Sequence, residues 1–159
     1  MIFNNKLLYN LEYTYILINE RLINMSNIFK HHISISKKTN LINITHEIEQ
    51  DILSSGIRNG IVVVYCPHTT AGITINENAD PDVIGDLIYG FEKAFPTSDK
   101  NYKHFEGNSH AHLKSSTVGA SQTLILNEGS LILGTWQNIY FCEFDGPRNR
   151  SYFVKIISG

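Results

Sequence analysis

With 159 residues and a formal net charge of −2, the chain has the size of one domain and no excess of basic residues. Proteins hold nucleic acid mainly through many Lys and Arg contacts to phosphate, so this charge balance argues against a nucleic-acid partner. A content of 42% hydrophobic and 18% charged residues indicates a globular protein that folds without disulfides.

Residues 1–24 precede the patterned part of the chain and are expected to be an N-terminal extension. The extension would be either a disordered segment or the product of an upstream start codon. Glu12 and Arg21 break its apolar runs, so no span reaches the roughly 20 apolar residues of a membrane helix. Since Glu12 also interrupts the apolar region that a secretory signal would need, we expect a cytoplasmic protein with no membrane partner. The folded domain is expected to cover residues 25–159.

The domain begins with a predicted strand at 28–35 and a predicted helix that starts near Asn43 or Thr45 and ends at Gly56. The helix carries isoleucines four residues apart on one face: Ile44, Ile48 and Ile52. The continuous apolar run at 61–66 predicts a strand buried on both faces, which would bring His68 to a strand end.

A short alternating strand, GITINEN, then leads to the most clearly marked helix, 81–94. Asp80 is expected to cap this helix, with Pro81 in its first position. Its apolar residues form one stripe: Val83, Ile84, Leu87, Ile88 and Phe91. Periodicity then disappears from Pro96 to about Thr117, which predicts a long irregular and functional loop.

The C-terminal third reads as strands. A hairpin is expected to turn at Asn127 and Gly129, and Trp136 is expected in the core on the following strand. Cys66 and Cys142 lie in apolar runs and are expected to be buried thiols in a reducing compartment. These elements predict a single α+β domain with a mixed, mainly antiparallel sheet and two main helices.

Histidines are concentrated in the irregular segment, where three of the seven fall between residues 104 and 112. In an extended segment, His110 and His112 would point the same way and offer two imidazoles to one metal ion. Together with His104 they are the metal-ligand candidates, and a divalent ion such as Zn or Mg is the expected cofactor. A metal-free site that uses histidine as acid or base is the alternative.

Hydroxyl groups and a lysine point to anion binding. The side chains of Thr69, Thr70, Ser115 and Ser116 and the ammonium of Lys114 are chemically suited to phosphate. His68 and Glu77 are each expected at a strand end, so the strand ends and the long loop would converge on one cleft.

Three blocks, PHTTAGITINENADPDVIGDL, GNSHAHLKSS and SQTLILNEGSLILGTWQNIYFCEFDGPR, together resemble the YjbQ family, also known as secondary thiamine-phosphate synthase enzymes. The resemblance covers about 28–157 and implies a single α+β domain that assembles as a homotrimer. It also implies a shared polar pocket, in which His110 would be a less uniform member. The catalytic residues expected there are His68, Glu77, Asp86 and Lys114. The substrate-binding residues expected are Thr69, Thr70, Asn76, Ser115 and Ser116.

The activity that the resemblance implies joins a pyrimidine methyl diphosphate to a thiazole phosphate and releases pyrophosphate. Two alternatives stay open: a metal-dependent hydrolase of a small substrate, and a non-catalytic trimer that binds a metal or a small ligand. Each of the three hypotheses involves a small molecule rather than a macromolecule, and a small phosphorylated substrate is the expected partner.

Overall fold

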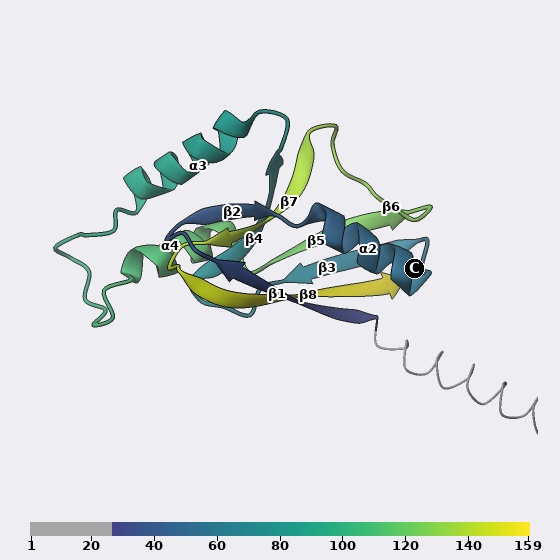
Figure 1. Ribbon diagram of the computed structural model, residues 1–159, viewed down its shortest axis with the longest axis horizontal. Helices are drawn as coiled ribbons and strands as arrows, with labels where there is room; N and C mark the ends of the chain where they lie inside the picture. Colours follow the sequence, from purple (N-terminus) through teal and green to yellow (C-terminus); the bar gives the residue numbers. More distant parts are fainter. Residues whose placement is uncertain (1–26) are drawn as a thin grey trace, which may run out of the picture.

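The strands of this protein form two antiparallel sheets (Figure 1). The structure is a computed structural model and describes residues 27–159, so the predicted extension at 1–24 lies outside the described residues. The first sheet has the order β1-β8-β3-β5-β6, with the bounds β1 Ile28–Ile35, β3 Gly60–Tyr65, β5 Ser121–Asn127, β6 Ser130–Leu131 and β8 Arg148–Ser158. The second sheet has the order β2-β7-β4, with the bounds β2 Asn40–Asn43, β4 Ala71–Glu77 and β7 Gln137–Glu143.

The main core follows from alternation along the strands. On β8, Tyr152, Val154 and Ile156 are buried and the residues between them are not, as expected for a strand with one face inward. The prediction that the 61–66 strand is buried on both faces was wrong. Val62 and Val64 are fully buried, whereas Ile61 is 39% exposed. α2 and the second sheet pack against one face of this sheet, whereas apolar residues of the other face, Ile61, Ile125 and Ile157, are exposed.

Helix α2 (Thr45–Ser55) confirms its prediction. Ile48 and Ile52 of the helix, and Ile44 just before it, are buried against the main core. Asn43 accepts a hydrogen bond from the backbone N–H of Thr45. Gly56 ends the helix with φ 69°, a left-handed conformation that glycine adopts without a steric penalty.

Helix α3 (Pro81–Ala94) also has the predicted bounds, and the side chain of Asp80 accepts from the N–H of Asp82. Its apolar stripe is only half-buried, however, and no residue of the helix is fully buried. Figure 1 shows α3 at the periphery, set off from both sheets. The stripe packs against a second, smaller core cluster: Leu41, Ala111, Tyr140, Cys142 and Phe144.

The prediction of an irregular segment up to Thr117 was wrong, because α4 (Ser109–Val118) is a helix. Its burial pattern is inverted relative to an ordinary amphipathic helix. His110, Lys114 and Ser115 are buried while Leu113 is 40% exposed. A hydrophobicity pattern therefore gives no sign of this helix.

The C-terminal strands agree with the sequence except at Trp136. The hairpin between β5 and β6 turns at Glu128 and Gly129, which both have positive φ. Cys66 and Cys142 are both buried, as predicted. Trp136 was expected in the core, but it precedes β7 and is 62% exposed. None of the helices within residues 27–159 is long and apolar enough to span a membrane.

Candidate functional site

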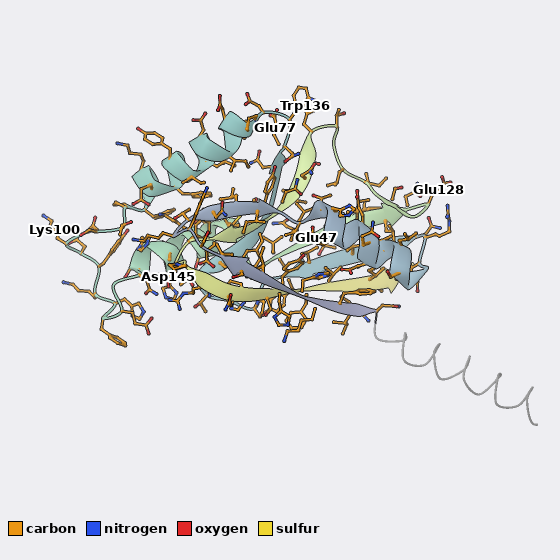
Figure 2. All side chains as sticks on the ribbon, viewed as in Figure 1. Glu47, Glu77, Lys100, Glu128, Trp136 and Asp145 are labelled. Carbon is orange, nitrogen blue, oxygen red and sulfur yellow. The ribbon has the colours of Figure 1, made fainter. Side chains whose placement is uncertain are left out.

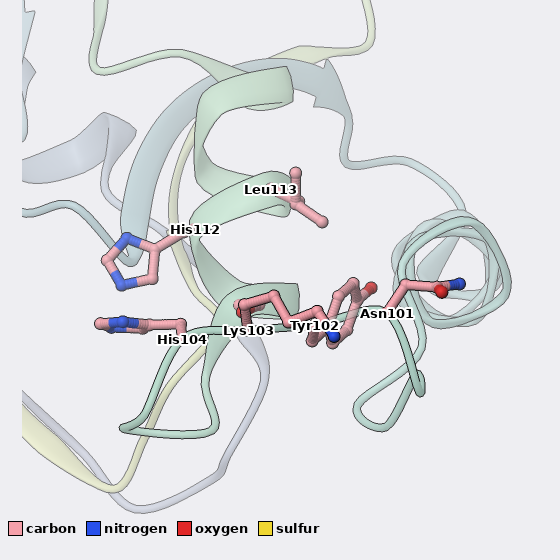
Figure 3. Close-up of a pocket in the computed structure, with 7 residues that line it drawn as sticks. Asn101, Tyr102, Lys103, His104, His112 and Leu113 are labelled. Carbon is pink, nitrogen blue, oxygen red and sulfur yellow. The ribbon is translucent and has the colours of Figure 1, made fainter.

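Two cavities meet at His112, which lines both. The first cavity, shown in Figure 3, has a volume of about 510 Å³. Its lining residues are Asn101, Tyr102, Lys103, His104, Ser109, His112 and Leu113. The second cavity has a volume of about 500 Å³. Its lining residues are His68, Thr69, Ala71, His112, Ser115, Ser116, Gly119 and Ala120.

Helix α4 explains why these groups come together. Residues three and four apart on a helix share a face, so His112, Ser115 and Ser116 reach the same side. The preceding segment then returns His104 to His112, with ring centroids 5.2 Å apart in an edge-to-face arrangement (Figure 3). The Nε2 atom of His104 lies 3.7 Å from a carboxylate oxygen of Glu106.

His68 reaches the second cavity from the segment that follows β3. Its Nε2 lies 3.1 Å from the backbone nitrogen of Ser151 on β8. Burial lowers the pKa of His68, and the nearby positive charge of Arg150 lowers it further. The imidazole is therefore held in its neutral form at neutral pH.

The four predicted hydroxyls divide into two kinds. Ser115 and Thr70 are buried and engaged inside the protein: Ser115 donates to the carbonyl of Thr69, and Thr70 accepts from Arg150 at 2.8 Å. Thr69 and Ser116 are exposed and line the second cavity. The structure therefore leaves these two hydroxyls facing solvent in the cavity.

Lys114 lies away from both cavities. It is completely buried, and its Nζ atom donates to Glu92 of α3 at a distance of 2.6 Å. Partial burial acts to raise the pKa of Glu92, but hydrogen bonds from Lys114 and Thr97 lower it to about 2. In this chain the lysine joins α4 to the last turn of α3 instead of facing a phosphate.

The predicted carboxylates do not join His68. Glu77 lies at the far end of β4, beside Trp136 (Figure 2), where Asn76 accepts a hydrogen bond from its backbone N–H. Asp86 lies on α3 and lines a third cavity of about 580 Å³ between α3 and Thr117. Within one chain, the predicted catalytic residues thus occupy separate places.

His110 and His112 do not point the same way, as was predicted for an extended segment, because both lie in helix α4. Successive residues of an α-helix are rotated by about 100°, so positions i and i+2 face nearly opposite directions. His112 faces the cavities, while His110 is buried with no hydrogen-bond partner for either ring nitrogen within residues 27–159. Burial, with help from Lys114 and Lys38, lowers the pKa of His110.

In the described part of the chain, no three His, Cys, Asp or Glu side chains are grouped in a way that could hold a metal ion. Within residues 27–159, the residues of one chain therefore do not fit a preformed metal site with three protein ligands.

A buried network behind the second cavity was missed by sequence reasoning. Arg150 donates to both carboxylate oxygens of Glu143 at 2.6 and 2.7 Å. Oε1 of Glu143 also accepts from the N–H groups of Phe144 and Asp145. The charges at 143 and 150 were visible in the sequence, but their burial was not, because neighbouring arginines near a turn are usually solvated.

The fold is that of a small α+β protein, and its two adjoining cavities are lined by histidines and hydroxyl groups. A comparison with protein families matches residues 30–159 to the family described as UPF0047 protein YjbQ-like. The chain belongs to this YjbQ family, as the resemblance in its sequence predicted.

Individual relatives are similar over most of their length. The UPF0047 protein YugU of Bacillus subtilis is 54% identical over 79% of this chain and 95% of its own. A UPF0047 protein of Methanocaldococcus jannaschii is 53% identical over 82% of this chain and 94% of its own.

Solved structures support the same fold. An uncharacterised YjbQ/UPF0047 protein of Clostridium acetobutylicum superposes with a TM-score of 0.79 at 53% identity, covering 81% of this chain and 99% of its own. A protein of unknown function from Sulfolobus solfataricus gives a TM-score of 0.79 at 34% identity, covering 83% of this chain and 96% of its own.

Proposed function

We propose that this protein is a transferase that joins two small phosphorylated heterocycles, one held on each side of His112. In the specific form implied by its family, a pyrimidine methyl diphosphate reacts with a thiazole phosphate. The thiazole nitrogen forms a bond to the methylene carbon, the bond from that carbon to the diphosphate oxygen breaks, and pyrophosphate leaves. The observation that carries the proposal is the pair of similar cavities with one imidazole common to both.

The lining of each cavity supports this assignment. In the second cavity, His68 and the exposed hydroxyls of Thr69 and Ser116 offer hydrogen bonds to a diphosphate. In the first cavity, Lys103 offers a positive charge and His104 an imidazole ring nitrogen to the phosphate of the acceptor. Holding both reactants in fixed orientation lowers the barrier, because the entropy of bringing them together is lost on binding.

The uncovered face of the first sheet supports the proposal of a homo-oligomer, with a trimer as the form the family implies. Ile61 is paired in register with Ile125 on one side and Ile157 on the other, and these side chains are 39%, 62% and 43% exposed. Contiguous apolar surface of this kind marks an association site. Light scattering of the full chain tests the trimer, and Ile125→Glu is expected to reduce the assembled mass.

The transferase is tested with the purified full chain and both substrates, by measuring pyrophosphate and the joined product. His112→Ala is expected to reduce the rate by about a hundredfold because both reactants lose a contact. His46→Ala, on the exposed face of α2, is the matched control and is expected to leave the rate unchanged.

Three results would contradict the transferase. Pyrophosphate release without the thiazole phosphate would instead favour a hydrolase, and binding without turnover would favour a non-catalytic protein. Equal rates for His112→Ala and His46→Ala would show that the paired cavities are not the site. Metal analysis of the freshly purified protein tests separately whether a divalent ion accompanies the diphosphate.

A further inference from the structure

The side chain of His68 continues the sheet where strand β3 stops. β3 and β8 pair as far as Tyr65 and Phe153. If the same register continued for two more residues, Pro67 would lie opposite Ser151. Proline has no N–H and cannot extend the ladder. In its place, the Nε2 atom of His68 lies 3.1 Å from both the nitrogen and the carbonyl oxygen of Ser151.

A neutral imidazole nitrogen either donates or accepts, so Nε2 can satisfy only one of these two groups. If Nε2 accepts, the N–H of Ser151 is satisfied and its carbonyl is left without this bond. If Nε2 donates, the N–H is the group left without a partner in the described chain. An unpaired backbone N–H is the rarer and more costly outcome, because a carbonyl has two lone pairs and is more easily satisfied elsewhere. This balance favours the tautomer in which Nε2 accepts and the proton lies on Nδ1.

Two interactions hold the segment around His68 in this position. The guanidinium of Arg150 donates to the hydroxyl of Thr70 at 2.8 Å, and the N–H of Phe144 donates to the Thr70 carbonyl at 3.2 Å. Arg150 is itself fixed by Glu143, which is completely buried. Because Arg150 precedes Ser151 on β8, its ion pair with Glu143 holds in place the backbone that contacts the His68 ring. Through the hydroxyl of Thr70, the same ion pair also holds the segment that carries His68.

We propose that His68 serves as a fixed, neutral hydrogen-bond donor, through Nδ1–H, to an anionic phosphate oxygen in the second cavity. In this assignment His68 is not a general base, because its acceptor nitrogen is engaged with Ser151. Arg150 and Glu143 are positioning residues that act through the 67–70 segment. The nature of the anion rests on the proposed function, whereas the tautomer rests on the fold alone.

The tautomer is tested first, in the absence of any ligand, by long-range proton–nitrogen NMR of the full chain labelled with ¹⁵N histidine. At neutral pH, Nδ1 is expected to have the shift of a protonated ring nitrogen and Nε2 that of an unprotonated one. A proton on Nε2, or a charged ring, would overturn the inference whatever the substrate proves to be.

The positioning role is tested by the same signal in Thr70→Val, which keeps the size of the side chain and removes the hydroxyl that Arg150 contacts. The variant is expected to show a mixture of both tautomers at His68 while the rest of the spectrum remains folded. An unchanged single tautomer would overturn the positioning role. Ser116→Ala is the matched control, because Ser116 lines the second cavity and its hydroxyl makes no hydrogen bond to Arg150 within residues 27–159.

The anionic partner is tested by titrating inorganic pyrophosphate into the unaltered chain, His68→Ala and His68→Asn. Loss of one hydrogen bond to a charged group is expected to weaken binding by His68→Ala about tenfold or more, while the amide of His68→Asn restores part of the affinity. Unchanged affinity in His68→Ala would overturn the donor role. Absence of pyrophosphate binding to the unaltered chain, with the expected tautomer present, would overturn the proposed substrate class and with it the anionic partner.

Discussion

The completely buried ammonium of Lys114 lies 2.6 Å from the carboxylate of Glu92, which is about half exposed at 47%. This contact joins the middle of α4 to the last turn of α3, 22 residues earlier in the chain. The lysine carries a full charge into the interior, so its stability there depends on a partner from another helix.

Replacement of Glu92 by Gln is therefore expected to destabilise the fold by about 2 kcal/mol, less than for a fully buried pair because water reaches the carboxylate. Urea unfolding measures this loss. Since a buried pair can often be replaced by apolar groups at little cost, Lys114→Met combined with Glu92→Gln is expected to recover most of it. A double variant as unstable as the single one would contradict this account.

The same contact makes stability sensitive to acid. The folded-state pKa of Glu92 is about 2, below its ordinary value of 4.5, so the folded protein binds this proton less readily than the unfolded chain. The contribution of Glu92 is thus fully present above pH 4.5 and is lost as the pH falls towards about 2. Urea unfolding at several pH values is expected to show the difference between the unaltered chain and Glu92→Gln shrinking over this range. A difference that stays constant would refute the assignment.

Gly72 on β4 is expected to tolerate no larger residue. A Cβ atom there would lie 2.6 Å from the carbonyl oxygen of Gly119 and 3.0 Å from Val118. Gly72→Ala should therefore cost about 1–3 kcal/mol and shift the wall of the second cavity, which Gly119 lines. Gly85→Ala on α3 is the control: it meets nothing within 4 Å and should stabilise by about 0.5–1 kcal/mol. Thermal unfolding compares the two variants, and equal effects would contradict the packing argument.

His110→Leu is expected to keep or raise stability, because it removes two buried ring nitrogens that have no partner in the described chain. His112→Leu should leave stability within about 0.5 kcal/mol, since a partly exposed side chain is replaced. The midpoint of urea unfolding checks both. A loss of more than about 1 kcal/mol in His110→Leu would mean that an ordered water or ligand satisfies the imidazole.

The elements that sequence reasoning identified are those with local signals. The isoleucines of α2 repeat at helical spacing and Gly56 ends the helix, while Asp80 and Pro81 start α3. Each of these signals lies within a few residues of the element it defines, which is why the bounds of α3 were predicted without error.

Burial was less predictable, because it depends on which surfaces meet. Val62 and Ile61 are equally apolar and adjacent, yet only Val62 faces α2 and the second sheet. For α4 the usual relation is reversed, since Lys114 is buried by its ion pair and Leu113 is exposed. No periodicity of apolar residues reveals a helix whose inner face is polar.

Only part of the candidate site was predictable, because the position of its residues also depends on which parts of the chain meet in the fold. His68, His104 and His112 do line the two cavities, as do Thr69 and Ser116. Glu77 was assigned to the same cleft from its place at a strand end, and Asp86 from the family resemblance. Within one chain, both lie away from His68. Long-range placement of this kind is set by strand order, which the sequence does not encode locally.

Helix α3, with no fully buried residue, has a consequence for motion. Local opening costs least where little apolar surface is lost, so the amide hydrogens of α3 should exchange with solvent before those of the central strands β3 and β8. In such an opening, Glu92 would move away together with α3, and the ammonium of Lys114 would become exposed to water. The third cavity, between α3 and Thr117, is therefore expected to widen when α3 opens, while both sheets stay intact.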